Sequence, residues 1–123
     1  MRAAVLVAIA IPIFTSQLEK AREATDASNV RAMYAEITSG YLTGELQSSS
    51  GIHVGDNKAV TWNGTALTAT VDYTAVQQKD GWVGDAPKIG TVALGDLNGA
   101  TKIVYTFQDD TDGDLILKSV TKG

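Results

Sequence analysis

The feature that most constrains this chain is its N-terminal stretch, from Ala3 to Tyr41. The stretch begins as a nearly uninterrupted apolar run, AAVLVAIAIPIF, and continues as TSQLEKAREATDASNVRAMYAEI, which has the pattern of an amphipathic helix. A helix that is apolar all round in one half and one-sided in the other requires two environments. The rest of the chain can cover the one-sided half. The apolar half must therefore meet lipid, detergent or another copy of the chain.

Composition places the chain among ordinary folded proteins of one domain. It has 123 residues, of which 44% are hydrophobic and 20% charged, and its net charge is −4. The ten basic residues are scattered rather than clustered, which argues against a nucleic-acid partner. The chain has no cysteine, so disulfides, thiolate nucleophiles and sulfur metal sites are excluded.

The apolar run from Ala3 to Phe14 has 12 residues, fewer than the ~20 that span a bilayer. No small-residue cleavage site follows it, so a secretory signal peptide fits poorly. Pro12 lies inside the run. We favour one continuous helix from Arg2 to Thr43, kinked at Pro12. The alternative is a new helix that begins at Ser16, where Ser16 and Glu19 match a capping box.

The amphipathic half carries apolar residues at helical spacing, with charged residues between them. One set of residues is predicted to form a continuous stripe: Phe14, Leu18, Ala21, Thr25, Val30, Met33, Ile37 and Tyr41. Charged residues on the other side can pair at i+3 or i+4, as Glu19–Arg22, Lys20–Glu23 and Arg22–Asp26. These pairs predict a solvated helix face, and an alternative role is registration between subunits.

The remaining chain has the pattern of short strands. Residues 59–62 form a strand that ends at Asn63-Gly64, a type I′ hairpin signal, and residues 67–73 alternate between apolar and polar. Residues 76–82 are ambiguous, and residues 89–97 read as a connection interrupted by glycines. Strands at 103–107 and 115–120 follow, joined by the turn 109–114.

The expected fold class is therefore α+β: one long N-terminal helix with a small antiparallel β-sheet packed on its C-terminal half. The helix is expected over residues 1–45. Within it, residues 1–14 form an apolar assembly or membrane segment and residues 15–45 an amphipathic one. The sheet domain is expected over residues 46–123.

The strongest candidate for ion binding is the acidic turn, where Asp110, Asp112 and Asp114 surround a glycine and could place three oxygens around calcium. Asp-Gly is equally typical of a hairpin turn, and the glutamate that would complete an EF-hand loop is missing. His53, the one histidine, lies in a loop rich in glycine and serine with no ligand spacing around it. We expect no catalytic site and no cofactor other than this possible calcium.

The segment AVLVAIAIPIFTSQLEKAREATDASNVRAMYAE resembles the N-terminal helix of type IV pilins and of the related pseudopilins. In that family, an apolar helix with an Ala-Ile-Pro-Ile step runs into an amphipathic half that packs on a C-terminal sheet. The resemblance covers about a third of the chain. The family's basic leader, cleavage glycine, N-methylated phenylalanine and buried glutamate precede the part of the pattern seen here, while the helical packing surface is retained.

The resemblance implies a structural subunit of an extracellular filament at the cell surface, a homo-oligomer with a membrane-anchored precursor. The residues expected to drive assembly share the apolar half of the helix: Val5, Leu6, Ile9, Ile11, Pro12, Ile13, Phe14 and Leu18. One alternative is a pseudopilin of a secretion or DNA-uptake machine, which occupied calcium would favour. Another is a membrane-tethered binding module or adhesin, which Trp62 or Trp82 exposed in a pocket would favour.

Overall fold

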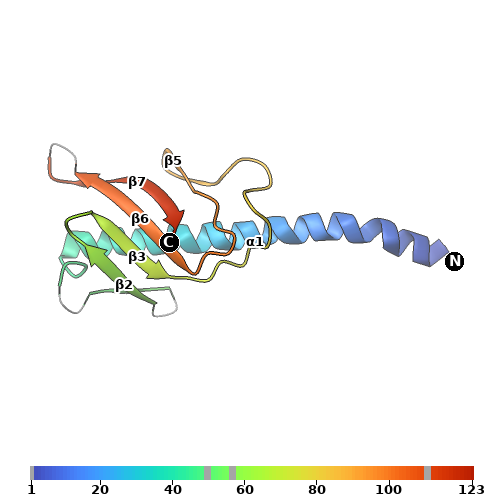
Figure 1. Ribbon diagram of the computed structural model, residues 1–123, viewed down its shortest axis with the longest axis horizontal. Coiled ribbons are helices and arrows are strands. Elements are labelled where there is room, and N and C mark those ends of the chain that lie inside the picture. Colours follow the sequence, from blue (N-terminus) through green and yellow to red (C-terminus); the bar gives the residue numbers. More distant parts are fainter. Residues whose placement is uncertain (1, 49–50, 56–57, 110–111) are drawn as a thin grey trace.

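The computed structural model describes residues 2–48, 51–55, 58–109 and 112–123, with side chains from Gln17 onward. Among these residues, one long helix, α1 (Arg2–Thr43), is followed by strands and the loops that join them. It runs without interruption past Pro12, so the prediction of one continuous helix is confirmed and the start at Ser16 is wrong. Figure 1 shows the N-terminal turns of α1 deflected from the axis of the rest of the helix.

Five strands form one antiparallel sheet in the order β1-β2-β3-β6-β7. Their bounds are β1 (His53–Val54), β2 (Lys58–Asn63), β3 (Thr68–Asp72), β6 (Lys102–Asp109) and β7 (Leu115–Lys122). Between β3 and β6, the two-residue strands β4 (Lys88–Ile89) and β5 (Val92–Ala93) pair as a separate small hairpin. The α+β class is confirmed.

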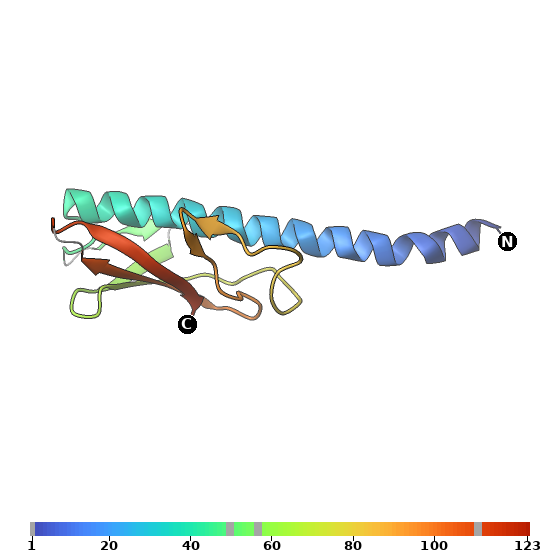
Figure 2. The ribbon, with the colours of Figure 1, turned by 90° about the horizontal axis from the view of Figure 1, so that it is seen from above.

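The sheet and the helix form two layers, with the sheet along one side of the C-terminal half of α1 (Figure 2). Val30, Met33 and Ile37 point from the helix into the core, each at most 2% exposed. Across from them, the buried Tyr105 of β6 donates a hydrogen bond from its hydroxyl to the Val30 carbonyl at 2.8 Å. The C-terminal half of the predicted apolar stripe is therefore buried as expected, apart from the half-buried Tyr41.

Helix α1 ends against a tightly packed loop. Gly44 adopts a left-handed φ of 84°, and its N–H bonds the Tyr41 carbonyl at 3.1 Å. One turn earlier, Gly40 lies so close to Ile52 that a Cβ atom on Gly40 would stand 2.7 Å from the Ile52 Cδ1. Glycine is therefore required at residue 40 by contact and at residue 44 by backbone conformation.

The turn between β2 and β3 differs from the predicted type I′ hairpin at Asn63-Gly64. Asn63 pairs with Thr68, so four residues form the loop, and Leu67 rather than Gly64 has a positive φ, of 55°. The Asn63 Oδ1 accepts hydrogen bonds from the N–H groups of Thr65 and Ala66, both at 3.0 Å. The asparagine side chain closes a wider turn, which explains why the two-residue prediction is wrong.

The two edges of the sheet are built differently. One edge is β1, a strand of only two residues. At the other edge, β7 forms a parallel bridge between Val120 and Leu94, and the Gly95 N–H donates to the Val120 carbonyl at 3.0 Å. The segment that follows β5 thus covers part of the outer side of β7.

Candidate functional site: the projecting helix and its collar

The first turns of α1 extend beyond the sheet into open space (Figures 1 and 2). From Arg2 to Leu18 this projecting segment is about 25 Å long at 1.5 Å per residue. Seven of the predicted assembly residues lie on its helical backbone, and their side chains are outside the described part of the structure: Val5, Leu6, Ile9, Ile11, Pro12, Ile13 and Phe14. The eighth, Leu18, is described and is 39% exposed.

Where α1 leaves the body, the loop of residues 75–83, here called the collar, packs along the helix. The collar follows β3 and is attached to α1 largely through its own backbone. Its main anchor is Asp26, which has no solvent exposure. The Asp26 carboxylate accepts hydrogen bonds from the Tyr73 hydroxyl at 2.7 Å and from the N–H groups of Val76 and Gln77, both at 3.0 Å.

Two further carboxylates extend this anchor toward the N-terminus of the helix. Glu23, 7% exposed, accepts the Val83 N–H at 2.8 and 3.1 Å. Glu19, 1% exposed, accepts the N–H groups of Gln78 and Lys79 at 3.2 to 3.3 Å. Because each buried carboxylate receives charge-assisted hydrogen bonds, the collar satisfies these acidic groups without any lysine or arginine side chain of its own.

This arrangement shows that the prediction of the buried face is wrong for residues 18–26 of α1. Leu18, Ala21 and Thr25 were expected to be buried and are exposed, whereas the acidic residues expected on the solvated face are buried. The Glu19–Arg22 ion pair is confirmed, at 3.6 Å. The other two acidic residues bind collar N–H groups instead of their predicted basic partners on the helix. The physical reason is that the collar offers a row of backbone donors, which an apolar stripe could not satisfy.

Tyr73 links the collar anchor to the sheet. Its hydroxyl donates to Asp26 and accepts from the Asn29 side-chain amide at 3.1 Å. Burial raises the pKa of Tyr73 to about 12, and the hydrogen bond to the Asp26 carboxylate adds to the rise. Tyr73 therefore stays a neutral donor throughout the physiological pH range.

The helix face that points away from the sheet is lined by small residues. Ser28, Ala32 and Ala35 are exposed and follow one another at spacings of four and three. Such a face lets another helix approach closely, because it carries no long side chain at these positions. The exposed Ala21 and Thr25 lie between this face and the projecting segment and extend the face toward that segment.

The calcium candidate receives no support from the described residues. Asp110 lies outside them, and Asp112 and Asp114 are exposed in the turn between β6 and β7. In residues 2–48, 51–55, 58–109 and 112–123, no group of three or more His, Cys, Asp or Glu side chains could hold a metal ion. His53 lies in β1 and is exposed, so the histidine expected in a loop belongs to a short strand.

The two tryptophans have different surroundings. Trp62 is half-buried and its ring packs against Tyr41 at 5.9 Å and Phe107 at 6.2 Å between centroids, which is a core-packing role. Trp82, also half-buried, lines a shallow groove of about 290 Å³ between the collar side of α1 and residues 82–87. The polar and charged residues along that groove include Lys20, Arg31 and Asp85.

A second, more apolar pocket lies at the opposite end of the body, where α1 ends. It has a volume of about 210 Å³. Its walls come from the last two turns of the helix and from the β6–β7 hairpin, and its lining residues are Ile37, Thr38, Tyr41, Leu42, Phe107, Asp114 and Leu115. Leu42 is 76% exposed at its rim.

Comparison with known proteins adds no relative: no family model, no curated protein and no solved structure matches this chain. Within the described residues, the helical stretch does not combine the length and the apolarity that crossing a bilayer requires.

Proposed function

We propose that this protein is a structural subunit of an extracellular filament similar to a type IV pilus, which assembles through its N-terminal helix. The observation that carries the proposal is the apolar half of α1, whose backbone projects about 25 Å beyond the sheet. A helix placed so far from its own body has no core of its own chain to enter.

The energetic drive for assembly follows from the apolar content of that segment. Between Ala3 and Phe14 the sequence has seven large apolar residues. Burying a side chain of this kind contributes ~1.5–3 kcal/mol each. Parallel packing of such helices in the centre of a filament would remove this surface from water and leave the sheets facing outward.

The test is the double substitution Ile9→Asp with Phe14→Asp. Two carboxylates in the helix bundle would lack partners, so we expect filaments seen by negative-stain electron microscopy to disappear, together with the sedimenting fraction. The sheet domain should keep its thermal midpoint, because both residues lie on the projecting segment.

A matched control carries the same change in charge elsewhere. Thr121→Asp with Thr61→Asp places two carboxylates at exposed strand positions. This control should assemble like the parent chain. Filaments that persist in the helix double variant, or that are lost equally in the control, would count against the proposal.

A second candidate function, a binding module displayed at the cell surface, draws support from the groove beside Trp82. An aromatic ring next to lysine, arginine and aspartate offers both donors and acceptors, which suits a polar ligand with an apolar face such as a sugar. In a Trp62→Phe background, Trp82 is the one remaining tryptophan. Quenching of its fluorescence by soluble oligosaccharides, removed by Trp82→Phe, would support this function.

A further inference from the structure

Exposed large apolar side chains gather at two opposite ends of the body. At the root, where the projecting segment leaves the body, Leu18, Val76 and Val83 are 39%, 44% and 43% exposed; we call them the root patch. At the other end, Leu42 is 76% exposed at the rim of the apolar pocket, and Ile116, 43% exposed, follows the pocket residue Leu115 on β7; we call Leu42 and Ile116 the tip patch. Exposed apolar patches of this kind mark interaction surfaces.

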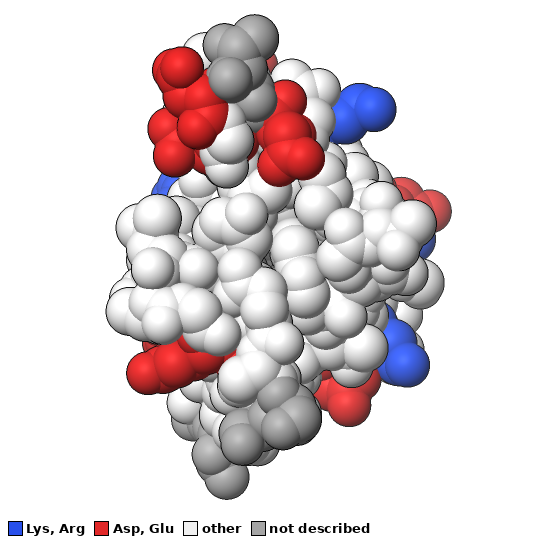
Figure 3. Space-filling model, turned by 90° about the vertical axis from the view of Figure 1, so that its left-hand side faces the viewer, with Lys and Arg blue, Asp and Glu red and all other residues white. Residues whose placement is uncertain are grey.

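The tip is acidic. Asp109, Asp112 and Asp114 are exposed on the β6–β7 hairpin next to the pocket. Viewed from this end, acidic side chains gather at the top beside a broad uncharged face, and the basic side chains in view lie at its margins (Figure 3). The tip thus combines an apolar hollow with a negatively charged rim.

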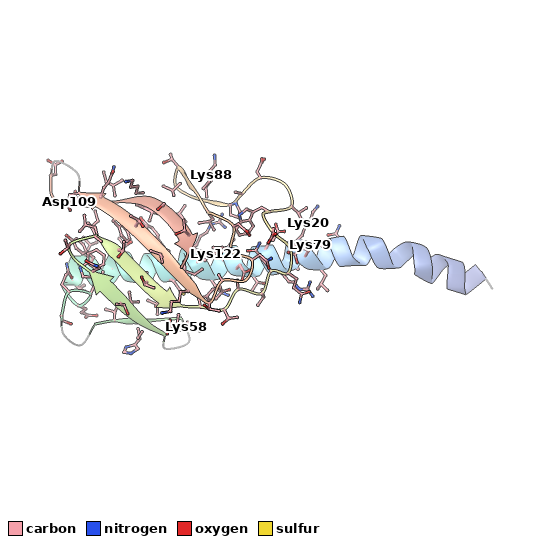
Figure 4. All side chains as sticks on the ribbon, viewed as in Figure 1. Lys20, Lys58, Lys79, Lys88, Asp109 and Lys122 are labelled. Atoms are coloured by element: carbon pink, nitrogen blue, oxygen red, sulfur yellow. The ribbon has the colours of Figure 1, made fainter. Side chains whose placement is uncertain are left out.

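The root exposes lysines. Lys20 and Lys79 lie there, at the far end of the body from Asp109 (Figure 4). The glutamate carboxylates at this end are buried under the collar. The exposed Asp80 accepts a hydrogen bond from the Asn98 side chain at 2.7 Å. Asp85, which lines a groove with Lys20 and Val83, is exposed as well. The root therefore presents apolar side chains with two lysines and two aspartates, a mixed charge that accepts the acidic tip through its lysines.

We propose that the tip patch of one copy docks onto the root patch of a second copy, so that bodies stack head to tail along the filament. The inference rests on the proposed function and names a contact outside the helix bundle. A contact between two different patches of the same chain is heterologous, and it continues into an open polymer when its rotation does not close a ring.

The distance between the patches fits the projecting segment. From Leu18 to Leu42 the helix rises about 36 Å, which sets the expected displacement between stacked copies. At that displacement, the projecting segment of the second copy runs beside the body of the first. It would then face the exposed Ser28, Ala32 and Ala35, where small side chains allow close approach. A single axial displacement of about 36 Å would thus bring both the bodies and the helices of two copies into contact.

The absence of cysteine allows a direct trap. Leu42→Cys combined with Val83→Cys places one thiol in each patch, and a short bis-maleimide should link filaments into a ladder of covalent multimers. The matched control, Leu42→Cys with Thr61→Cys, keeps the tip thiol and moves the other to an exposed residue of β2. We expect no ladder beyond dimers from that control.

Charge reversal provides a second measurement. Lys79→Glu should lower the sedimenting fraction several-fold at low salt, and adding Asp109→Lys should restore most of it, because the pair is inverted rather than removed. Lys118→Glu, at an exposed lysine of β7, is the control for net charge. Equal thermal midpoints would show that all variants are folded.

The outcomes separate the two proposals. A ladder, a rescue by the inverted pair, and a displacement of about 36 Å between contacting bodies in a filament reconstruction would support the stacking. Filaments that form without a ladder and ignore both charge changes would overturn the stacking and leave the filament proposal standing. A parent chain that forms no filaments would overturn both.

Discussion

Asp26 is the residue on which the junction between helix, collar and sheet depends. It is fully buried, yet three donors from two other segments converge on its carboxylate. The donors are far away in sequence, between 47 and 51 residues later. A single side chain therefore joins parts of the chain that are distant in sequence and belong to different layers.

Replacing Asp26 by Asn should destabilise the protein. The amide group of asparagine would face N–H donors, so at least one buried donor would lose its acceptor and the charge-assisted bonds would become neutral. We expect the free energy of unfolding to fall by about 2–3 kcal/mol, measured by urea denaturation. Asp85→Asn, at an exposed residue, is the control and should change it little. An unchanged midpoint in Asp26→Asn would contradict this account of the collar.

Tyr73 predicts how stability depends on alkaline pH. Its pKa is raised to about 12 in the folded protein from an ordinary value of 10.0. The unfolded chain therefore releases the proton first, and the stabilising contribution is complete below pH 10 and is lost as pH rises toward 12. In Tyr73→Phe, the decline in unfolding free energy between these pH values should be shallower than in the parent chain. An equally steep decline would show that other groups, such as the buried Tyr105, account for it.

At the scale of elements, the spacing of the buried residues along α1 explains which part of its buried face the sequence predicts and which part it does not. Glu19, Glu23 and Asp26 continue the spacing of four and three shown by the buried apolar residues of the lower helix. The buried face therefore keeps the same residue spacing along the helix, while its residues change from apolar in the C-terminal half to acidic nearer the N-terminus. This spacing is visible in the sequence. Because carboxylates are mostly solvated, however, the spacing alone does not predict that these three are buried. The N–H groups that bind the three carboxylates come from the collar, whose sequence has no regular pattern.

The other differences also have local causes. Strands β1, β4 and β5 are two residues long, too short to show alternation. The turn after Asn63 is set by hydrogen bonds of the asparagine side chain, whereas the dipeptide Asn-Gly favours a tighter one. The long strands β6 and β7, with a clear apolar face, were predicted nearly to their observed ends.

The packing of α1 on the loop after it can be tested at Gly40. Gly40→Ala should lower the free energy of unfolding by about 1–2 kcal/mol despite the better helix propensity of alanine, because the new Cβ would overlap the Ile52 Cδ1. Adding Ile52→Val removes that methyl group. The double variant should be more stable than the sum of the single effects predicts, as a double-mutant cycle would measure. Strict additivity would contradict a direct contact.

At the scale of the whole molecule, the two halves of α1 should differ in local stability. The projecting segment extends beyond the sheet, and an isolated helix of this length is marginal in water. We expect hydrogen exchange to be fast for residues 2–18 in dilute monomer and at least roughly ten-fold slower after assembly, while residues 26–40 stay protected in both states. Fast exchange of the projecting segment in filaments would place the assembly surface elsewhere.

The construction of the sheet edges has a consequence for the proposed filament. Unpaired strand edges invite irregular growth by strand addition, the route toward amyloid. Here one edge is the very short β1, and the other, β7, is partly covered where Gly95 bonds Val120. Both edges are poor templates for another strand, even at the high local concentration that the proposed bundle of helices would create. If the proposed filament forms, it should therefore grow by addition of folded subunits rather than by misassembly of their sheets.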